Sequence, residues 1–408
     1  MKKFNNSNLW WEKASKIIPG GCSTIAKSPL RLYANSTPFC CSEANGAFFK
    51  DIDGNEWLDC EMSMGSIIWG HSREEINNEI IKQLKKGTSY SIPSNIELEL
   101  AELIIKRFNY YNSIRFCKSG ADAVSAAVRI ARVVTSKEKV VYGTYHGWHD
   151  WSSYGYYNNE VEILGIPKNL DQICVWLEKE SLNEDLKNLL EKKAGEIACL
   201  VISPSNWLQK DLSELKISCR NKNIVLIFDE VTSGMRWGLK GATGVHGVWP
   251  DILCISKGLA NGMALGAILA DKCLLNVCLS IKMSNAHSTE CISMAAAFAS
   301  EKLLENMKVW PTWKSRGQQT VDLIREKIIE KKMDSILTVT GNYASFRIHT
   351  PGKTIHTDKF REFFVKFLAN ADIFSMGYIL LSDKHTNANI EMIQNEILAA
   401  IKNWAEMS

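Results

Sequence analysis

The chain has 408 residues, of which 46% are hydrophobic and 23% are charged, and its formal net charge is only +3. This length accommodates about two or three domains with a large buried core. Lysine and arginine are scattered without a basic stripe, which argues against a nucleic-acid partner. No acidic tail suggests a disordered arm for a protein partner, so we expect a small-molecule substrate.

The N-terminus and the cysteines predict a cytoplasmic protein. Lys2 and Lys3 are followed by no apolar run of signal-peptide length. No stretch reaches the roughly 18 apolar residues of a membrane span, so we expect no membrane contact. The twelve cysteines contain no CxxC pair, which indicates free, mostly buried thiols in a reducing compartment rather than a zinc or redox site.

The first hundred residues contain a hairpin and a helix. Strands are expected at residues 47–51 and 56–59 around the Asp53-Gly54 turn. Ser94 and Glu97 have the spacing of a capping box. They would open an amphipathic helix whose apolar face carries Leu100, Leu103 and Ile104.

The middle of the chain alternates short apolar strands with longer helical patterns, such as the helical run at residues 121–132. The strands are nearly continuous in apolar residues, which is typical of a parallel sheet covered by helices on both faces. This pattern predicts an α/β domain. The expected strands are Ile114–Cys117, Lys139–Tyr142, Ala198–Ser203, Ile224–Asp229 and Ile252–Ser256.

After about residue 300 the pattern changes to long helices around a few strands. Helical periodicity runs through residues 318–331, 357–369 and 389–404. We therefore predict a large domain at 61–300 and a smaller α+β domain at 301–408, with the N-terminal segment 1–60 packing against the small domain.

The first candidate site feature is the turn Lys118-Ser119-Gly120-Ala121 between a strand and a helix. The free N–H groups at the start of a helix form an anion site, and glycine lets a phosphate approach closely. A tight connection between a strand and a helix can contain Ser-Gly without binding anything, so the motif is weak alone.

The second feature is the aromatic cluster from Tyr145 to Trp151, just past the strand at 139–142. An aromatic side chain there could stack on a flat heteroaromatic ring. His146 and His149 also suggest a metal site, but the glutamate of an HExxH motif is missing and no third ligand is apparent. We expect no metal.

The third feature is Asp229, which directly follows five apolar residues. This places a carboxylate at the C-terminal edge of a strand, where ligands bind in open α/β sheets. It could pair with a protonated ring nitrogen of a cofactor. Capping the next helix or binding Mg²⁺ are the alternatives for this residue alone.

The fourth feature is Lys257, at the end of the apolar strand 252–256 and followed by glycine. Burial lowers the pKa of a lysine from about 10.4, in extreme cases by several units. The less protonated amine can attack a carbonyl and form an imine. Taken alone, the residue is more readily interpreted as a lysine that extends from a strand end to solvent.

The order of these features points to one cofactor. A phosphate cradle, a ring-stacking aromatic, an aspartate for a pyridine nitrogen and a strand-end lysine follow one another in a single α/β domain. Together they predict an enzyme that binds pyridoxal 5'-phosphate (PLP) as a Schiff base on Lys257.

At these residues the chain resembles a class III aminotransferase of PLP fold type I, and within it the glutamate-1-semialdehyde aminomutase-like branch. The resemblance runs almost end to end. It is carried by the segments 18–21, 51–56, 145–151, 228–231 and 251–262.

The resemblance implies a role for each candidate residue. Lys257 would form the Schiff base and move the proton, and Asp229 would pair with the pyridine nitrogen. Tyr145 and Val231 would lie on either face of the ring, with His146 and Asn206 nearby. The N–H groups of Gly120 and Ala121 and the Ser119 hydroxyl would hold the phosphate. The family also implies a homodimer with shared active sites.

Several positions depart from the family pattern. Ser203-Pro204 stands where relatives usually have Glu-Pro, and Ala286 aligns with a threonine that reaches the phosphate from the neighbouring subunit. Ser288 or Thr289 would substitute for that threonine. Lys27 replaces an arginine and Met64 a tryptophan of the aminomutase substrate pocket, and lysine lacks the bidentate fork of arginine.

These changes favour an aminotransferase that moves an amino group between a donor and a keto or aldehyde acceptor. An intramolecular aminomutase and an epimerase or racemase are the alternatives that use the same cofactor. A non-catalytic protein with this fold is the alternative from another class. The substrate and any oligomer larger than a dimer are not predicted.

Overall fold

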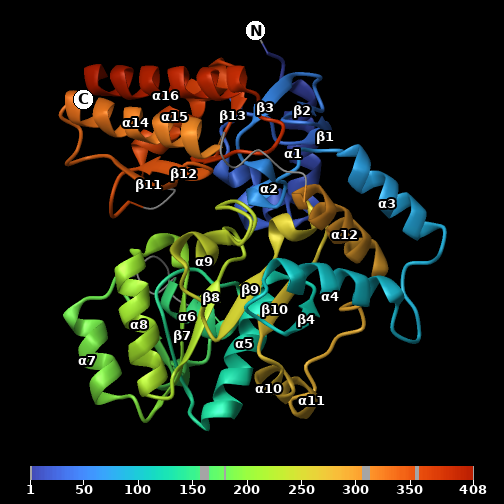
Figure 1. Ribbon diagram of the computed structural model, residues 1–408. Coiled ribbons are helices and arrows are strands. Elements are labelled where there is room, and N and C mark those ends of the chain that lie inside the picture. Colours follow the sequence, from blue (N-terminus) through green and yellow to red (C-terminus); the bar gives the residue numbers. More distant parts are fainter. Residues whose placement is uncertain (1, 157–164, 179–180, 306–312, 354–357, 408) are drawn as a thin grey trace. The chain divides into compact units, whose positions relative to one another are not determined.

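The computed structural model describes residues 2–156, 165–178, 181–305, 313–353 and 358–407. Contacts within the chain divide it into two compact units, residues 75–306 and residues 1–74 with 307–408 (Figure 1). The domain boundaries predicted at residues 60 and 300 stay a prediction. In the described part of the chain, no helix has the length and apolarity needed to cross a membrane.

The unit 75–306 is built on a sheet of seven strands in the order β4-β10-β9-β8-β7-β5-β6. All neighbouring pairs are parallel except those of β10, which runs antiparallel to both β4 and β9. The strands are β4 Ser113–Cys117, β5 Lys139–Tyr142, β6 Cys174–Trp176, β7 Ile197–Ile202, β8 Val225–Asp229, β9 Ile252–Ile255 and β10 Gly266–Ala270. The predicted α/β class is confirmed.

The five strands predicted in this unit are all present within about one residue of their expected ends. Every residue of β7, β8 and β9 is buried, as a continuous apolar run requires. The sequence analysis missed β6 and β10. The first has three residues, and the second contains glycine and two alanines, which are poor strand formers.

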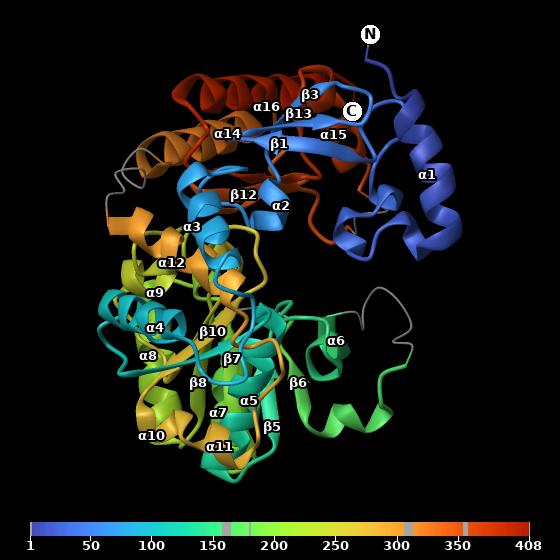
Figure 2. The ribbon, with the colours of Figure 1, turned by 90° about the vertical axis from the view of Figure 1, so that its right-hand side faces the viewer.

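The helix α5, Gly120–Thr135, packs across one face of this sheet against β4, β7, β8, β9 and β10 (Figure 2). Alanines on its buried face, including Ala123, Ala127 and Ala131, contribute to the core between helix and sheet. The other helices of the unit are α3 Glu74–Leu84, α4 Asn95–Arg107, α6 Asp150–Tyr156, α7 Glu184–Lys192, α8 Gln209–Asn221, α9 Gly241–His246, α10 Lys272–Leu275, α11 Val277–Ser280 and α12 Cys291–Glu305.

The capping box predicted at the start of α4 does not form. Ser94 is the N-cap residue, but its hydroxyl makes no capping hydrogen bond and is buried without a partner. The helix itself begins where predicted, and Leu100 and Ile104 are buried. Burial of this apolar face therefore stabilises the helix without the cap.

In the other unit, the N-terminal hairpin joins a C-terminal strand in one sheet of order β1-β2-β3-β13. The strand β13 pairs in parallel with β3, so residues more than 300 positions apart lie side by side. The hairpin predicted around Gly54 is present as β2 and β3. The strands are β1 Cys41–Asn45, β2 Phe48–Asp51, β3 Glu56–Asp59 and β13 Ile373–Phe374.

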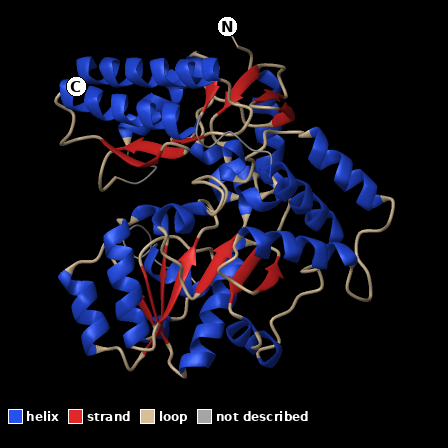
Figure 3. Cartoon of the chain, viewed as in Figure 1, coloured by secondary structure: helices blue, strands red, loops and turns tan. Residues whose placement is uncertain are grey.

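A second sheet of this unit, in the order β11-β12-β14, is antiparallel (Figure 3). Two helices, α14 and α15, pack against α16. The three predicted helices are therefore present, although residue 357 lies outside the described residues. The bounds are β11 Thr338–Asn342, β12 Ser345–His349, β14 Tyr378–Leu380, α1 Asn5–Ile17, α2 Met62–Gly65, α14 Gln318–Glu330, α15 Lys359–Asn370 and α16 Asn387–Met407.

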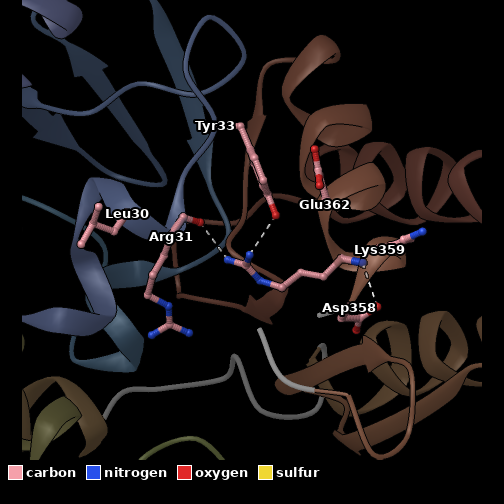
Figure 4. Close-up of a pocket in the computed structure, with 7 residues that line it drawn as sticks. Leu30, Arg31, Tyr33, Asp358, Lys359 and Glu362 are labelled. Atoms are coloured by element: carbon pink, nitrogen blue, oxygen red, sulfur yellow. Dashed lines mark hydrogen bonds between the residues drawn. The ribbon is translucent and has the colours of Figure 1, made fainter. Parts of the chain in front are cut away.

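Arg361 on α15 ties the N-terminal segment to the C-terminal half of this unit. Its guanidinium donates to the Tyr33 hydroxyl at 3.1 Å, the Arg31 carbonyl at 3.0 Å and the Met376 carbonyl at 2.9 Å. These contacts line a pocket of about 130 Å³ beside Asp358 (Figure 4). Because all three nitrogens of the guanidinium donate to protein oxygens, we assign Arg361 a structural role.

In the unit 75–306, α4 and α12 are joined by a buried ion pair. Arg107 donates to both carboxylate oxygens of Glu301, at 2.8 and 2.7 Å, and the two side chains are only 5% and 3% exposed. Arg107 also donates to the carbonyl of Leu239. The bidentate geometry compensates both charges for the loss of water.

Glu301→Ala leaves the Arg107 guanidinium buried without its carboxylate. We expect the free energy of unfolding in urea to fall by about 3–5 kcal/mol. The control is Glu362→Ala, which removes an exposed pair with Lys366 and should lower it by less than about 1 kcal/mol. Equal losses in the two variants would contradict the assignment.

Candidate active site

Most of the predicted site residues follow strands whose carboxyl ends share one edge of the seven-stranded sheet. Because β10 is antiparallel to β4 and β9, the strands β4, β5, β7, β8 and β9 all run in the same direction. Their carboxyl ends lead into the segments that carry Ser119, Tyr145, Ser203, Asp229 and Lys257. This is the edge at which open α/β sheets bind ligands.

The predicted anion site lies at the N-terminus of α5. Ser119 is the N-cap residue, and its hydroxyl accepts from the Asp122 N–H at 3.1 Å and donates to the Asp122 carboxylate at 2.9 Å. The first intrahelical bond is donated by Ala123. The N–H groups of Gly120 and Ala121 precede it, at the end of the helix where the dipole favours an anion.

Three glycines set the space around this turn. A Cβ atom on Gly120 would lie 2.6 Å from a methyl group of Val231, and one on Gly266 would lie 2.5 Å from the carbonyl oxygen of Ser119. A Cβ atom on Gly147, whose φ is +113°, would lie 2.5 Å from the Cβ atom of Ala121. The turn is therefore held from three sides by contacts that any larger residue would break.

Asp229 is held at the end of β8 by two hydrogen bonds. Its Oδ1 accepts from the N–H of Val231 at 2.9 Å, and its Oδ2 lies 2.7 Å from Nδ1 of His146. His146 is only 2% exposed. The predicted cofactor contact of His146 stays a prediction, and the contact that the structure gives it is with this carboxylate.

The hydrogen bonds continue behind His146. Its Nε2 lies 3.3 Å from the Thr144 hydroxyl, which lies 3.3 Å from the Ser203 hydroxyl. Its backbone N–H donates to the hydroxyl of Ser152. The sequence analysis missed Thr144 and Ser152, because a hydroxyl in a loop carries no signal until its partner is known.

Lys257 opens the 3₁₀ turn η6, Lys257–Ala260, directly after β9 and Ser256. Its backbone has a φ of +48°, in the left-handed region that non-glycine residues seldom adopt. Its Nζ donates to the hydroxyl of Thr232 at 2.8 Å. Desolvation lowers its pKa to about 8, against the opposing effect of the Asp229 carboxylate and in the same direction as the Arg236 charge.

The remaining predicted residues of this unit are more exposed. Tyr145 is 47% exposed, and Val231 packs against Gly120. Asn206 is exposed at the end of the 3₁₀ turn η5, Pro204–Asn206. Ser288 and Thr289 precede α12, where the next residue, Glu290, binds Lys118 at 2.9 Å.

Lys27 and Met64 lie in the other compact unit and are brought together there. The Nζ of Lys27 donates to the hydroxyl of Ser63 at 2.8 Å. Met62, Ser63 and Met64 all have left-handed backbones, with φ values of 42°, 52° and 58°. Such a run stores strain, because each residue costs about 1–3 kcal/mol relative to ordinary regions.

The described residues contain no cluster of three histidine, cysteine or carboxylate side chains that could hold a metal ion. All twelve cysteines are free thiols.

Comparisons with known proteins agree on one family. A model of the family "Aminotransferase class-III" matches residues 32–371. A glutamate-1-semialdehyde 2,1-aminomutase from Thermodesulfovibrio yellowstonii is 29% identical over 95% of this chain and 97% of its own length. Among solved structures, a transaminase with PLP bound has a TM-score of 0.85 at 24% identity over 100% and 99% of the two chains.

The fold is also shared with a glutamate-1-semialdehyde aminomutase from Pseudomonas aeruginosa. That structure has a TM-score of 0.83 at 17% identity and covers 98% of this chain and 94% of its own. Fold and site together define a PLP-dependent enzyme. The chain belongs to the class III aminotransferase family, as its resemblance implied, and its cofactor is PLP.

The residues at the sheet edge fit this cofactor. PLP carries a phosphate, a ring nitrogen that gains a proton, and an aldehyde that an amine can attack. The α5 terminus provides the anion site in a space that a Cβ atom would fill. Asp229 provides a fixed carboxylate, and Lys257 provides a partly buried amine whose pKa is lowered.

Gly266→Ala places a methyl group 2.5 Å from the Ser119 carbonyl oxygen and so displaces the phosphate turn. We expect the Kd for PLP to rise at least about tenfold, which corresponds to about 1.4 kcal/mol. The measurement is fluorescence titration of cofactor-free protein. Gly195→Ala is the control, because nothing lies within 4 Å of that position. An unchanged Kd in Gly266→Ala would show that the turn does not hold the phosphate.

The pKa of about 8 at Lys257 predicts the pH at which its amine becomes reactive. Only the neutral amine is nucleophilic, so acylation of Lys257 in cofactor-free protein should rise with pH through a midpoint near 8. Mass spectrometry of labelled peptides gives the rate at each pH. Lys50, whose pKa is raised by Glu43, is the internal reference. A midpoint of Lys257 as high as that of Lys50 would contradict the effect of burial.

Proposed function

We propose that this enzyme is an aminotransferase that moves an amino group between a donor and a keto or aldehyde acceptor, with Lys257 as the residue that bonds to the cofactor. The observation that carries the proposal is the position of the Lys257 amine. It is partly desolvated and within the field of Asp229, at the sheet edge that also carries the anion site.

Each of the other residues has a role in holding the cofactor. The N–H groups of Gly120 and Ala121 bind the phosphate. The Ser119 hydroxyl donates to Asp122. It either keeps this bond and so orders the loop, or rotates and donates to the phosphate. Asp229 keeps a proton on the pyridine nitrogen, and His146 fixes its carboxylate. Bound PLP supplies an electron sink for negative charge that develops at the substrate carbon.

Three further residues would contact the ring of the cofactor, and one more its phosphate. Tyr145 and Val231 would hold the ring between them, and Asn206 would hydrogen-bond to it. Val231 is well placed for this role, because its backbone N–H donates to Asp229 and its methyl groups pack on Gly120. Ser288 or Thr289 of the partner subunit supplies a hydroxyl to the phosphate in place of the missing threonine at 286.

Lys257 also moves the proton. A neutral amine near pH 8 can take a proton from the substrate carbon and return it elsewhere. Its pKa is close to that ideal for a base at cellular pH, because burial offsets the attraction of Asp229.

An intramolecular aminomutase is the second candidate, because curated relatives carry that name. The substrate pocket argues for another substrate. Lys27, which takes the place of the family arginine, donates to Ser63 and can pair with a carboxylate through a single charged group only. Met64 replaces a flat tryptophan by a flexible side chain. An epimerase or racemase would share the same residues.

We also propose that the enzyme is a cytoplasmic homodimer. Free thiols throughout the core suit a reducing compartment. Three apolar side chains on or between α3 and α4 are exposed by more than half, namely Leu84, Ile92 and Leu98. A second copy of the chain would cover this apolar surface.

Lys257→Ala tests the role of the lysine. We expect the variant to purify without the visible absorbance of the wild type and to lose at least about 10³-fold in kcat, since its nucleophile and base are both gone. Lys137→Ala is the matched control, because burial also lowers the pKa of Lys137 at a site away from the sheet edge. Wild-type absorbance in Lys257→Ala would overturn the proposal.

The reaction type is tested with a panel of amino donors. Each true donor should bleach the visible band of the wild-type enzyme in the absence of an acceptor, and a keto or aldehyde acceptor should restore it. Steady turnover of one substrate, with no second amino or keto compound consumed, would instead support the aminomutase.

A further inference from the structure

The ε-amino group of Lys257 has a specific partner that the family pattern did not suggest. Its Nζ donates to the Thr232 hydroxyl at 2.8 Å, across 25 residues of sequence. Thr232 is exposed on the segment that follows β8, three residues after Asp229. The hydrogen bond therefore lies on the open side of the sheet edge, where substrate and cofactor would have access.

The backbone around Thr232 is firmly held. The preceding N–H, of Val231, donates to Asp229. The following residue, Ser233, donates its hydroxyl to Glu230 at 2.6 Å, and the N–H of Gly234 donates to the Glu230 carbonyl. The Glu230 carboxylate is itself anchored by the N–H of Ala242 at 2.8 Å. This local network fixes where the Thr232 hydroxyl lies.

The backbone around Lys257 is also held in place. Ser256 donates its hydroxyl to the Leu265 carbonyl at 2.7 Å, and η6 packs against α12. Lys257 itself is held at a φ of +48°. A strained backbone persists only where its surroundings determine it. The segment that carries Thr232 and the segment that carries Lys257 are therefore both held in place. The flexible lysine side chain connects them through its hydrogen bond to Thr232.

A hydroxyl suits a lysine that changes its protonation state. It accepts a hydrogen bond from an ammonium group, and it can donate to the lone pair of a neutral amine. A carboxylate would bind the charged form much more strongly than the neutral amine. Asp229 already favours the charged form of Lys257, and Arg236 opposes it. Thr232 can hold the amine in both states without biasing it as strongly as a second charge.

We propose that Thr232 is a positioning residue for Lys257, which holds the free ε-amino group at the sheet edge whenever that group is not bonded to the cofactor. This inference rests on the proposed function of Lys257 as the residue that bonds to the cofactor and moves the proton. The hydroxyl keeps the amine at this edge in each turnover, while the preceding residue, Val231, ties the segment to Asp229.

Thr232→Val and Thr232→Ser separate the hydroxyl from the bulk of the side chain. In cofactor-free protein, valine leaves an ammonium group without its acceptor, so the labelling midpoint of Lys257 should fall by roughly one pH unit. Serine should keep the wild-type midpoint. Thr340→Val, which removes an exposed threonine hydroxyl in the other compact unit, should also leave it unchanged.

The same variants have a kinetic signature in the holoenzyme. Thr232→Val should lower kcat roughly tenfold and leave KM for the amino donor within about twofold, because a misplaced base affects the chemical step rather than binding. Serine should restore kcat. Circular dichroism and the urea midpoint show that each variant is folded.

The outcomes separate this inference from the proposed function. If Lys257→Ala loses the visible band but Thr232→Val keeps the wild-type midpoint and kcat, the role of Thr232 is wrong and the role of Lys257 stands. Loss of kcat in serine and valine alike would also overturn it, since the hydroxyl would not be what matters. Wild-type absorbance in Lys257→Ala would remove the basis of both.

Discussion

Keeping a lysine amine partly out of water, beside a carboxylate, is the constraint around which this sheet edge is arranged. Desolvation lowers the pKa of Lys257 to about 8, while Asp229 opposes that shift. The amine is thus neither fully charged nor inert near neutral pH. The balance depends on where Asp229 lies, which in turn depends on the Val231 N–H and on His146.

Small residues surround the turn at the start of α5. The α5 terminus attracts an anion only if the anion can reach the first N–H groups. Gly120 faces Val231, Gly266 faces the Ser119 carbonyl, and Gly147 faces Ala121, each at a distance that excludes a Cβ atom. One residue, Val231, contacts both this turn and Asp229, so the two parts of the site are positioned relative to one another.

The sequence predicts the strands of this site well and its hydrogen bonds poorly. Long apolar runs such as 224–229 carry the signal of a buried parallel strand, and a polar residue at their end carries the signal of the ligand edge. The antiparallel strand β10 is also apolar and buried throughout, but Gly266 and two alanines weaken its β propensity. Thr232 and Thr144 contact Lys257 and Ser203, which follow other strands, and only the fold brings these pairs together. Ser152 contacts His146 in the same segment, but a lone hydroxyl in a loop gives no signal of its partner.

The hydroxyl at position 203 has a consequence for the charge of the site. Asp229, His146, Thr144 and Ser203 are joined in one line of hydrogen bonds. A glutamate at position 203 would add a second negative charge to this edge and favour the protonated lysine. Serine at this position brings no charge. The attraction that opposes deprotonation of Lys257 comes from Asp229, and burial outweighs it.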